Sequence, residues 1–534
     1  MAEVVNPTRP ERLLTAAHVN PWVVAMTVTL ATFMEVLDTS IANVALPHIA
    51  GNLGATPDES TWVLTSYLVS NAIILPMSGW LSSRMGRKRF YMTCVVLFTF
   101  SSMLCGLAAS LPMLIFFRVM QGLGGGGLGP SEQAILADTF TPQQRNMGFA
   151  IYGMAIVVAP AIGPSLGGWI TDNFNWHWIF FINVPIGLIS LYLTNRVVHD
   201  PPYLIAEHKR RRGNTDYMGI TTIVIGIGLL QYVLDKGEEL DWLDSNAIRA
   251  ALTVSLIALA ALVWREWTHR NPIIDLRMLR LRNFGSATLF NFTLGVVLNG
   301  SMILIPQFLQ LQLGYTAEQA GWALSPAGFA LALLMPVAGI LSMKFDPRKV
   351  IALGFLLTSV SMFWMMRISP DVDFATVVWM RIFQVVGIPL IFIPISTLSY
   401  VGVPRESNNQ VSSISNFARN LGGAVGTSFL IAFLSRQRQI CRLGMVEHLH
   451  RGNFFYDRFL MGLQQAAQSK GSSPIVAVHQ SLMQLQQLVD FQANALAFIS
   501  AFFVLGVIVA CLVPLSFLMK KPSAEEMAAG AAVH

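Results

Sequence analysis

The sequence predicts an all-α integral membrane protein with fourteen transmembrane helices, built as two six-helix bundles of similar sequence with two extra helices between them. The 534 residues are 54% hydrophobic and only 12% charged, with a mean hydropathy of +0.55, whereas about a quarter of a soluble protein is charged. The apolar runs are about 18–28 residues long, which suits helices that cross a hydrocarbon core of roughly 30 Å. Short motifs of the first half also recur in the second half.

Fourteen apolar runs follow one another along the chain. We expect helices near 22–46, 60–82, 89–109, 112–136, 146–170 and 177–197, two extra helices near 217–235 and 247–264, and six more near 284–310, 320–342, 349–367, 374–399, 408–434 and 492–518. The predicted domains are an N-terminal bundle in residues 1–200, a cytoplasmic linker with the extra helices in 201–282, and a C-terminal bundle in 283–534.

The repeat supports this division. RVMQG at 118–122 recurs as RIFQVVG at 381–387, so that Arg381 follows Arg118 by 263 positions. GWLSSRMGRK at 79–88 has a weaker echo in GILSMKFDPRK at 339–349. Two parallel halves that face each other are a transporter plan, in which the substrate site lies near the bilayer midplane between the halves.

The basic residues indicate how the chain is oriented. With both termini in the cytoplasm, the termini and the loops after even-numbered spans hold 23 of the 35 Lys and Arg residues, including RMGRKR (84–89) and KRRR (209–212). The short loops after odd-numbered spans hold three. Cytoplasmic loops are typically rich in Lys and Arg, so we expect a multi-pass protein with both termini inside and the long segment 436–490 outside.

Several function classes find no support in the sequence. The net charge of +6 comes from basic clusters between spans, as topology requires, so we expect no nucleic-acid partner. There is no nucleophile elbow, HExxH or P-loop, and GLGGGG (122–127) lacks the Lys and Ser/Thr that follow a phosphate loop. The four cysteines show no metal spacing. We therefore expect no enzyme activity, no cofactor and no metal site.

The first apolar run carries two acids, Glu35 and Asp38, within FMEVLDTSIANVALP (33–47). Three positions apart on a helix, they share one face. Because a charged side chain facing lipid costs on the order of 3 kcal/mol, this face should look into a cavity. Such a pair can take up a proton on one side of the membrane and release it on the other. The alternative is a hydrogen-bonded, inert polar cap near the outer end of the helix.

Other charges lie inside predicted spans. Arg118 needs a partner in the membrane, which either acid of the first span could supply; it is either part of proton coupling or a structural ion pair. Glu132 lies deep in the fourth span and is a candidate second titrating or substrate acid. Arg381 and Arg419 are candidate structural counter-ions.

The ninth span, NFTLGVVLNGSMILIPQFLQLQ (291–312), carries amides among apolar residues. Amides beside aromatics and methionine suit an adaptable pocket for varied apolar ligands. Hydrogen bonding between helices explains them equally well. The candidate residues of a substrate cavity are Asn291, Phe292, Asn299 and Gln307.

Motifs along nearly the whole chain support a family resemblance. They are LDTSIANVALPHI (37–49), GWLSSRMGRKR (79–89), RVMQGLGGG (118–126), PAIGPSLGG (160–168), WHWIFFINVPIG (176–187) and LQYVLDKGEELDW (230–242). In these the chain resembles the major facilitator superfamily, specifically its fourteen-span drug:proton antiporters. The resemblance implies a multidrug efflux permease of the bacterial inner membrane, which exchanges small hydrophobic compounds for protons by alternating access. A proton-coupled transporter of one specific metabolite or lipid is the alternative.

The resemblance also implies roles for residues. It gives Asp38 and Arg118 parts in proton transfer. The loop after the second span would gate the conformational change through Gly79, Arg84, Gly86 and Arg87. The fifth-span motif would kink its helix and seal the resting cavity through Gly163, Pro164, Gly167 and Gly168, although plain tight packing explains these glycines almost as well. The loop motif usually has Asp where this chain has Ser83.

The external segment 436–490 is long for such a fold. Its last part, VAVHQSLMQLQQLVDFQ (476–492), places Leu482, Leu485 and Val489 at helical spacing among glutamines. This pattern is compatible with docking of a periplasmic adaptor protein, as in related exporters of double-membraned bacteria. A helix lying on the membrane surface is the alternative.

Overall fold

The computed structural model describes residues 20–142, 144–201, 204, 216–269, 271–368, 372–450 and 452–520, and those residues form helices and turns without a strand. The N-terminal half comprises α1 (Pro21–Leu53), α2 (Pro57–Met85), α3 (Arg87–Cys105), α4 (Leu111–Gly125), α5 (Leu128–Thr139), α6 (Arg145–Asn173), α7 (Trp178–Phe181) and α8 (Asn183–Val197). The basic run 209–212 lies outside the described residues.

Two further helices separate this half from the next. They are α10 (Tyr217–Lys236) and α11 (Asn246–Thr268). The C-terminal half comprises α12 (Arg282–Gln312), α13 (Ala317–Lys344), α14 (Pro347–Met365), α15 (Phe374–Leu398), α16 (Asn408–Val446), α17 (Phe454–Ser469) and α18 (Pro474–Leu515).

The predicted fold class is confirmed. In the described residues, thirteen helical segments are long and apolar enough to cross a membrane, with α4 and α5 counted as one segment and α7 and α8 as another. The fourteenth is α3, a 19-residue helix that begins with three basic residues and packs against α4 and α8. Local signals explain several helix starts; α2, for example, begins with a capping box in which Thr56 and Glu59 satisfy each other's backbone N–H.

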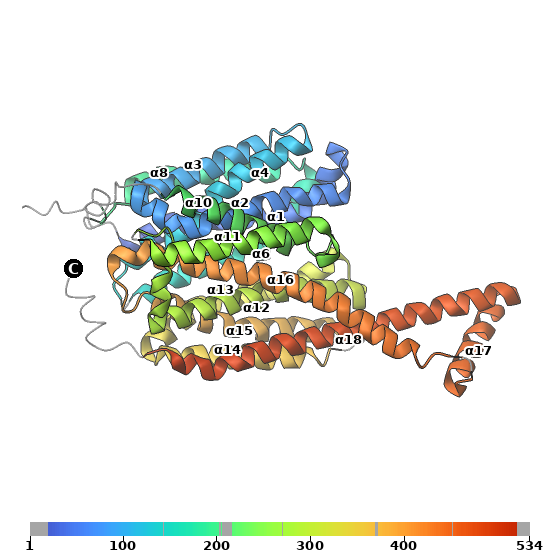
Figure 1. The fold of residues 1–534 in the computed structure, drawn as a ribbon. Helices are drawn as coiled ribbons and strands as arrows, with labels where there is room; N and C mark the ends of the chain where they lie inside the picture. The colour runs from blue at the N-terminus through green and yellow to red at the C-terminus, as the bar shows by residue number, and fades with distance from the viewer. Residues whose placement is uncertain are drawn as a thin grey trace, which may run out of the picture.

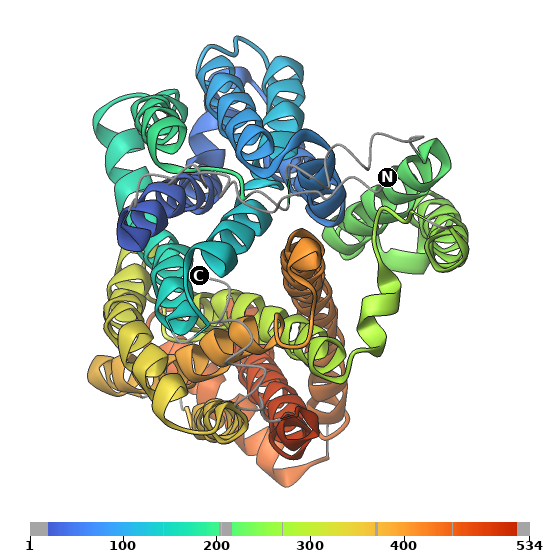
Figure 2. The same ribbon diagram turned by 90° about the vertical axis from the view of Figure 1, so that its left-hand side faces the viewer.

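The two halves pack side by side with their helices nearly parallel (Figures 1 and 2). They meet where α2 lies against α16 and where α6 lies against α13. The extra helices pair with each other, and α10 also contacts α2 and α16, beside one of these two seams (Figure 2). The two extra helices therefore flank the interface between the halves at one side.

Two predicted elements differ from the structure. The fourth span, expected as one helix over 112–136, breaks into α4 and α5 at a turn after Gly125. Its glycines pack against backbone: a Cβ on Gly122 would lie 2.5 Å from the carbonyl oxygen of Tyr67, and one on Gly126 would lie 2.5 Å from that of Asn71. Close approach to α2 and a bend therefore both depend on this run.

The second difference is the segment 436–490, a predicted external loop in which the sequence shows helical spacing only in the last part, 476–492. Here α16 continues to Val446, α17 follows, and α18 begins at Pro474, so most of the segment is helical. Figure 1 shows these helices projecting beyond the right-hand end of the bundle. Hydropathy marks only the part of a helix that suits lipid, so it does not reveal where a polar continuation ends.

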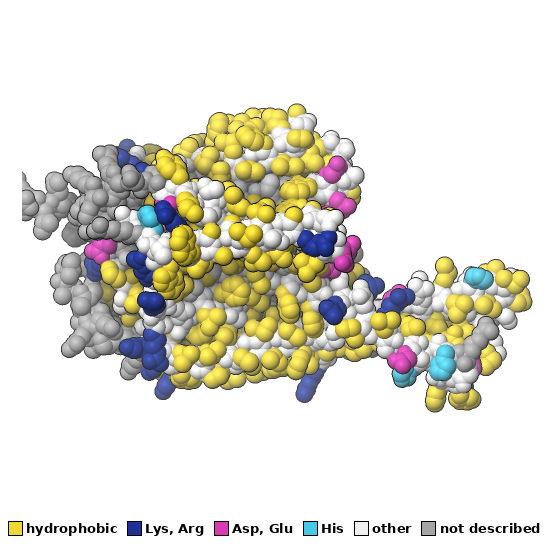
Figure 3. Space-filling view, viewed as in Figure 1, with side chains coloured by type: hydrophobic (Ala, Val, Ile, Leu, Met, Phe, Trp, Pro, Cys, Tyr) yellow, Lys and Arg dark blue, Asp and Glu magenta, His cyan; other side chains and the backbone are white. Residues whose placement is uncertain are grey.

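The surface agrees with a membrane position. Apolar side chains cover the flank of the bundle, and Lys and Arg gather toward the left-hand end in Figure 3. We call this the basic end, defined by residues 84–89 between α2 and α3. The helical extension of α16, α17 and α18 projects from the opposite end.

Candidate transport site

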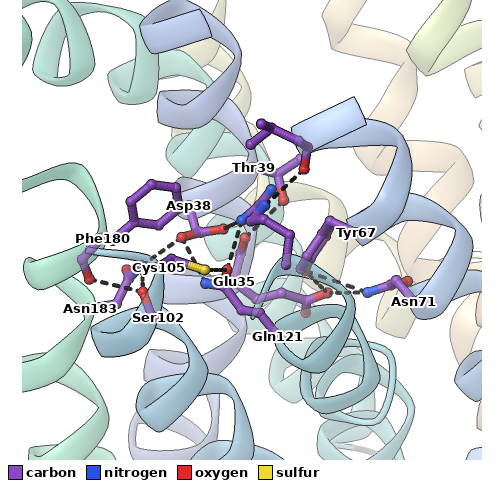
Figure 4. Close-up of polar contacts among 12 residues, drawn as sticks. Glu35, Asp38, Thr39, Tyr67, Asn71, Ser102, Cys105, Gln121, Phe180 and Asn183 are labelled. Carbon is purple, nitrogen blue, oxygen red and sulfur yellow. Dashed lines mark hydrogen bonds and ion pairs between the residues drawn. The ribbon is translucent and has the colours of Figure 1, made fainter. Parts of the chain in front are cut away.

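Asp38 and Arg118 form an ion pair in the interior of the N-terminal half. Arg118 Nη1 donates to Asp38 Oδ2 at 2.6 Å, and Arg118 is 0% exposed. Asp38 Oδ1 accepts from Gln121 Nε2 at 3.0 Å and from Asn183 Nδ2 at 2.7 Å (Figure 4). Both carboxylate oxygens of Asp38 are thus occupied by donors from α4 and α8.

The guanidinium of Arg118 is also enclosed. Its Nε donates to the carbonyl oxygen of Val63 at 3.0 Å, and its Nη1 donates to Gln121 Oε1 at 2.8 Å. The ring of Tyr67 lies 4.4 Å below it, a cation–π contact. A pair this deeply buried is held by several elements at once, so removing one partner would leave an uncompensated charge.

Glu35 occupies a different environment from Asp38. Its Oε1 accepts from Asn71 Nδ2 at 3.0 Å and from the hydroxyl of Tyr67 at 3.3 Å (Figure 4). It lines a cavity of about 320 Å³ between the two halves. Tyr67 therefore contacts both sites. Its ring lies against Arg118, the partner of Asp38, and its hydroxyl donates to Glu35.

Arg419 lines the same cavity from the opposite half. It lies on α16, where its Nη2 donates to Asn416 Oδ1 at 2.5 Å and to the hydroxyl of Tyr152 at 3.1 Å. Its guanidinium also lies 5.3 Å from the ring of Phe392. The cavity thus has an acid on one wall and a cation on the other, one from each half.

The predicted residues of the ninth span do not gather at the cavity. Asn299 lines it, but Asn291 is buried and donates to the carbonyl oxygen of Ala287 in its own helix at 3.0 Å. Phe292 and Gln307 line neither described cavity. The reason is spacing: residues eight positions apart on a helix are rotated by about 80°, so Asn291, Asn299 and Gln307 face three directions.

Glu132 is buried apart from the cavity. It lies on α5, is 0% exposed, and accepts from Thr29 Oγ1 of α1 at 2.5 Å. It is not among the residues that line the cavity. The structure therefore separates Glu132 from the Glu35 environment and places it in the packing between α1 and α5.

Arg87 joins the two halves at the basic end. Its Nε donates to Asn409 Oδ1 of α16 at 2.7 Å, its Nη1 donates to the carbonyl oxygen of Ala134 at 3.0 Å, and it forms an ion pair with Asp138. Asp138 in turn accepts from Asn408 Nδ2 at 2.6 Å. We call Arg87, Asp138, Asn408 and Asn409 the basic-end latch.

Gly79 and Ser83 lie beside this latch. A Cβ on Gly79 would lie 2.7 Å from the carbonyl oxygen of Asn409, so glycine permits the close contact of α2 with α16. Ser83 Oγ accepts from Asn409 Nδ2 at 3.4 Å. The carboxylate that contacts Arg87 is Asp138, so the latch has an acid although the loop motif has serine at position 83.

The other predicted gating residues have distinct surroundings. Gly86 has φ +89°, a conformation that favours glycine between α2 and α3. Arg84 lies over the ring of Trp80 at 5.3 Å, away from the latch. Arg84 lies in the last turn of α2, and Gly86 separates α2 from α3.

The fifth-span motif lies in α6 against α1. A Cβ on Gly163 would lie 2.3 Å from Ser40 Oγ, and one on Gly167 would lie 3.0 Å from Ile41, whereas Gly168 has nothing within 4 Å. Pro164 lies inside the same helix. Close packing accounts for Gly163 and Gly167, and the structure gives Gly168 no such constraint.

Arg381 has no carboxylate partner among the described residues. Its Nη1 donates to Gln384 Oε1 and, at 3.3 Å, to Ser301 Oγ. It does not line either described cavity. No group of three or more His, Cys, Asp or Glu in the described part of the chain could hold a metal ion.

Sequence reasoning missed four residues of these clusters. Tyr67, Asn71, Gln121 and Asn183 position the two acids, yet neutral polar residues occur in many spans and carry no charge to attract notice. The available signal was Tyr67 and Asn71 four positions apart in an apolar run, since that spacing places them on one face of a helix.

Comparison with known proteins identifies the family. Residues 28–427 match the sequence profile of the Major Facilitator Superfamily. The chain belongs to the Major Facilitator Superfamily. Within this superfamily it is 38% identical to the multidrug export protein EmrB of Escherichia coli K12 over 432 residues, which cover 81% of this chain and 83% of EmrB. It is also 38% identical over 426 residues to the fatty acid resistance protein FarB of Neisseria gonorrhoeae, covering 80% of this chain and 83% of FarB.

Solved structures of superfamily members share the fold. The proton:xylose symporter XylE bound to 6-bromo-6-deoxy-D-glucose aligns with a TM-score of 0.60 at 15% identity, covering 95% of this chain and 98% of XylE. A bacterial homologue of the human lysosomal transporter Spinster, in an inward-facing and occupied conformation, aligns with a TM-score of 0.51 at 16% identity, covering 94% and 98%. Superfamily membership makes the chain a multi-pass transporter.

Proposed function

We propose that the protein is a proton-coupled multidrug exporter of the bacterial inner membrane, with both termini and the basic end in the cytoplasm. The observation that carries the proposal is the cavity between the halves, with Glu35 on one wall and Arg419 on the other. The names of relatives that are 38% identical, such as EmrB, support drug export. The distribution of Lys and Arg supports the orientation.

Glu35 is the exchange site in this proposal. It lines the cavity, where a proton or a cationic drug can reach its carboxylate. Occupation by one then excludes the other, which couples drug release to proton uptake. One proton moving down 100 mV yields about 2.3 kcal/mol, which sustains a drug gradient of about fiftyfold.

Asp38 serves as a second proton acceptor in another conformation. Here its oxygens accept from Arg118, Gln121 and Asn183, so a proton reaches it only when one of these donors moves. Glu132 is buried and accepts a hydrogen bond from Thr29, so a proton also reaches it only after a rearrangement of the helices. In this scheme the two acids of α1 act in sequence, first in the cavity and then in the bundle interior.

The direct test uses purified protein in liposomes that contain a pH-sensitive dye. Addition of a lipophilic cation should release protons with wild type, and Glu35→Gln should abolish the release. Asp38→Asn should still bind the cation while failing to exchange protons. Gln307→Ala is a control, because Gln307 is exposed and lines neither cavity. If wild type moves no protons with any drug, the exporter proposal is wrong.

Export of fatty acids or related amphipathic anions is a second candidate. The name of FarB and the position of Arg419 in the cavity favour it, since a guanidinium matches a carboxylate in geometry. Transport of a fatty acid with no transport of cations, lost in Arg419→Gln, would decide for this narrower function.

The extension of α16, α17 and α18 is proposed to dock a periplasmic adaptor protein. It carries exposed apolar side chains, including Phe455, Ile475 and Met483, beyond the lipid-facing part of the bundle (Figure 3). Exposed apolar residues on a projecting helical extension mark an interaction surface. Cysteine crosslinking from Met483→Cys to a co-expressed adaptor should succeed if docking occurs, whereas labelling by lipid-soluble reagents instead would place α18 on the membrane surface.

A further inference from the structure

A second cavity of about 340 Å³ lies where the extra helix α10 meets α2, α12 and α16. We call it the side chamber. It shares Leu68, Asn299 and Asn420 with the cavity that holds Glu35. The two cavities are therefore neighbours, and these three residues line both of them. The side chamber lies on the side of the interface between the halves that faces α10.

The side chamber has two carboxylates and no lysine or arginine among its described lining residues. Asp235 accepts a hydrogen bond from Thr65, and Glu238 Oε2 accepts from Trp242 Nε1 at 2.7 Å. Neither acid has an ion-pair partner within the described part of the chain. The neighbouring Lys236 is engaged elsewhere, since its Nζ donates to Glu239 at 2.5 Å.

Helix stability does not explain these acids. Asp235 lies in the last turn of α10, and Glu238 follows its end. The C-terminus of a helix carries partial negative charge, so acids are unfavourable there. Their position is consistent with a need for negative charge at the chamber.

A polar group without a partner also lines the chamber. Ser428 is 4% exposed, and its Oγ has no hydrogen-bond partner in the described residues. Buried polar groups are normally satisfied, because leaving them unpaired is unfavourable. A bound molecule with a hydrogen-bonding group would satisfy Ser428, and the amide of Gln231 lines the same chamber.

The remaining walls are apolar, including Leu234, Met302 and Ile431. An apolar pocket with a few convergent polar groups is the usual form of a small-molecule site, and about 340 Å³ is at the lower end of the size range. Two acids on one wall specify positive charge. The chamber therefore matches an amphipathic organic cation.

We propose that the side chamber is a second substrate site, which holds lipophilic cations beside Asp235 and Glu238 and passes them to or from the central cavity. The extra helix α10 is then part of the transport path. This inference rests on the proposed exporter function and deepens it, because it assigns a place for substrate outside the Glu35 cavity.

The test measures binding of tetraphenylphosphonium to purified full-length protein, with Asp235→Asn and Glu238→Gln as variants. Each should raise the Kd of one of two sites by up to about fivefold, as expected for the loss of one partly hydrated charge interaction. Asp244→Asn is the matched control, because it removes an exposed acid of the same loop that does not line the chamber. A neutral drug should bind all variants equally.

Met302→Trp is a second variant that keeps the test decisive if an acid substitution fails to fold. Met302 lines the chamber and is partly exposed to it, so tryptophan should fill the space and remove one binding site without changing charge. A photoactivatable phosphonium should label residues 217–239 in wild type and not in Met302→Trp.

The outcomes separate this inference from the exporter function. If wild type exchanges cations for protons but the chamber variants bind and transport like the control, the side chamber is not a substrate site and the exporter proposal stands. If Glu35→Gln abolishes proton exchange while one phosphonium cation still binds and labels α10, the exporter proposal and the side-chamber proposal are both supported. A single site lost only in Glu35→Gln overturns the side chamber.

Discussion

The two halves contain equivalent buried arginine clusters, and only the first includes a carboxylate. In the first half Arg118 contacts Asp38 and Gln121. In the second half Arg381 contacts Ser301 and Gln384, and each of these residues follows its counterpart by 263 positions. The repeat has kept the arginine, the glutamine and their geometry, and it has serine in place of the carboxylate.

The difference teaches that duplication of the fold does not duplicate the chemistry. In the proposed function the first cluster exchanges a proton at Asp38 beside the charge of Arg118, whereas Arg381 of the second cluster has no carboxylate partner in the described residues. Its arginine is a buried charge compensated by two neutral groups. A proton-coupling step that needs this carboxylate can therefore operate in the first half only.

The largest expected effect is the loss of the first arginine. Arg118→Ala leaves Asp38 buried without its cation and should lower the free energy of unfolding by about 3–5 kcal/mol. Chemical unfolding in detergent micelles measures this. Arg381→Ala is the matched change and should be much milder, because it leaves no buried carboxylate behind. Equal losses in the two variants would contradict the comparison.

The comparison is sharpened by restoring the missing acid. Ser301→Asp should give Arg381 a carboxylate and stabilise the second half. In a double-mutant cycle with Arg381→Met, the two positions should couple by about 0.5–3 kcal/mol, measured by the same unfolding experiment. An absence of coupling would mean that the introduced acid does not reach Arg381.

A smaller effect is expected at the basic-end latch. Asp138→Asn removes the carboxylate from Arg87 and weakens a hydrogen bond from Asn408, by about 1–3 kcal/mol. The population with the halves separated at this end should rise. Distances between spin labels on α2 and α16 report it, with Asp58→Asn at the opposite end of α2 as control. An unchanged distance distribution would mean that other contacts keep the two halves together at this end.

The smallest effect is expected for an ion pair at the edge of the bundle. Arg265 Nε lies 3.1 Å from Asp216 Oδ2; the Arg265 side chain is 30% exposed, whereas that of Asp216 is 3% exposed. Asp216→Asn should lower the free energy of unfolding by about 1 kcal/mol or less, against several for Arg118. Both acids are buried, so this contrast tests whether exposure of the arginine to solvent, and not pairing alone, lowers the energetic weight of an ion pair.

The same pair has a definite pH dependence. Burial alone would raise the pKa of Asp216, but hydrogen bonds from Arg265 and from the Gly219 N–H, with the charges of Arg265 and His269, outweigh it and lower the pKa. Because the folded protein holds this carboxyl ionised, its stabilisation is present above the ordinary pKa of about 4 and is lost as the pH falls through the lowered value. Unfolding of wild type and Asp216→Asn should therefore converge in acid.

Much of the fold followed from the sequence, because a span must be long and apolar whatever its neighbours are. The break after Gly125 and the helical extension did not, since glycine runs and polar helices carry no mark of where they bend or end. The intramembrane charges Glu35, Asp38 and Arg118 stood out for their high cost in lipid. Their separation into a cavity and a buried pair did not, because three positions of spacing give a shared face without saying how neighbouring helices divide it.

The ninth span shows how helix rotation divides residues of similar chemistry. Its amides were grouped by their chemistry, yet the rotation of the helix distributes Asn291, Asn299 and Gln307 around it. Tyr67 shows the opposite failure, since a single neutral side chain links the surroundings of both acids. Such linkage depends on how α1, α2 and α4 pack, which only the structure specifies.

Arg87 reaches the other half through one hydrogen bond, from its Nε to Asn409 Oδ1, while its contacts with Ala134 and Asp138 lie within the N-terminal half. Asp138 supplies a second bond between the halves by accepting from Asn408. The halves therefore separate at the basic end only when the bonds to Asn408 and Asn409 are released. Each additional 1.4 kcal/mol in the strength of these bonds would slow that event about tenfold, while one proton supplies only about 2.3 kcal/mol per 100 mV. The strength of the basic-end latch should thus limit how often the transporter cycles.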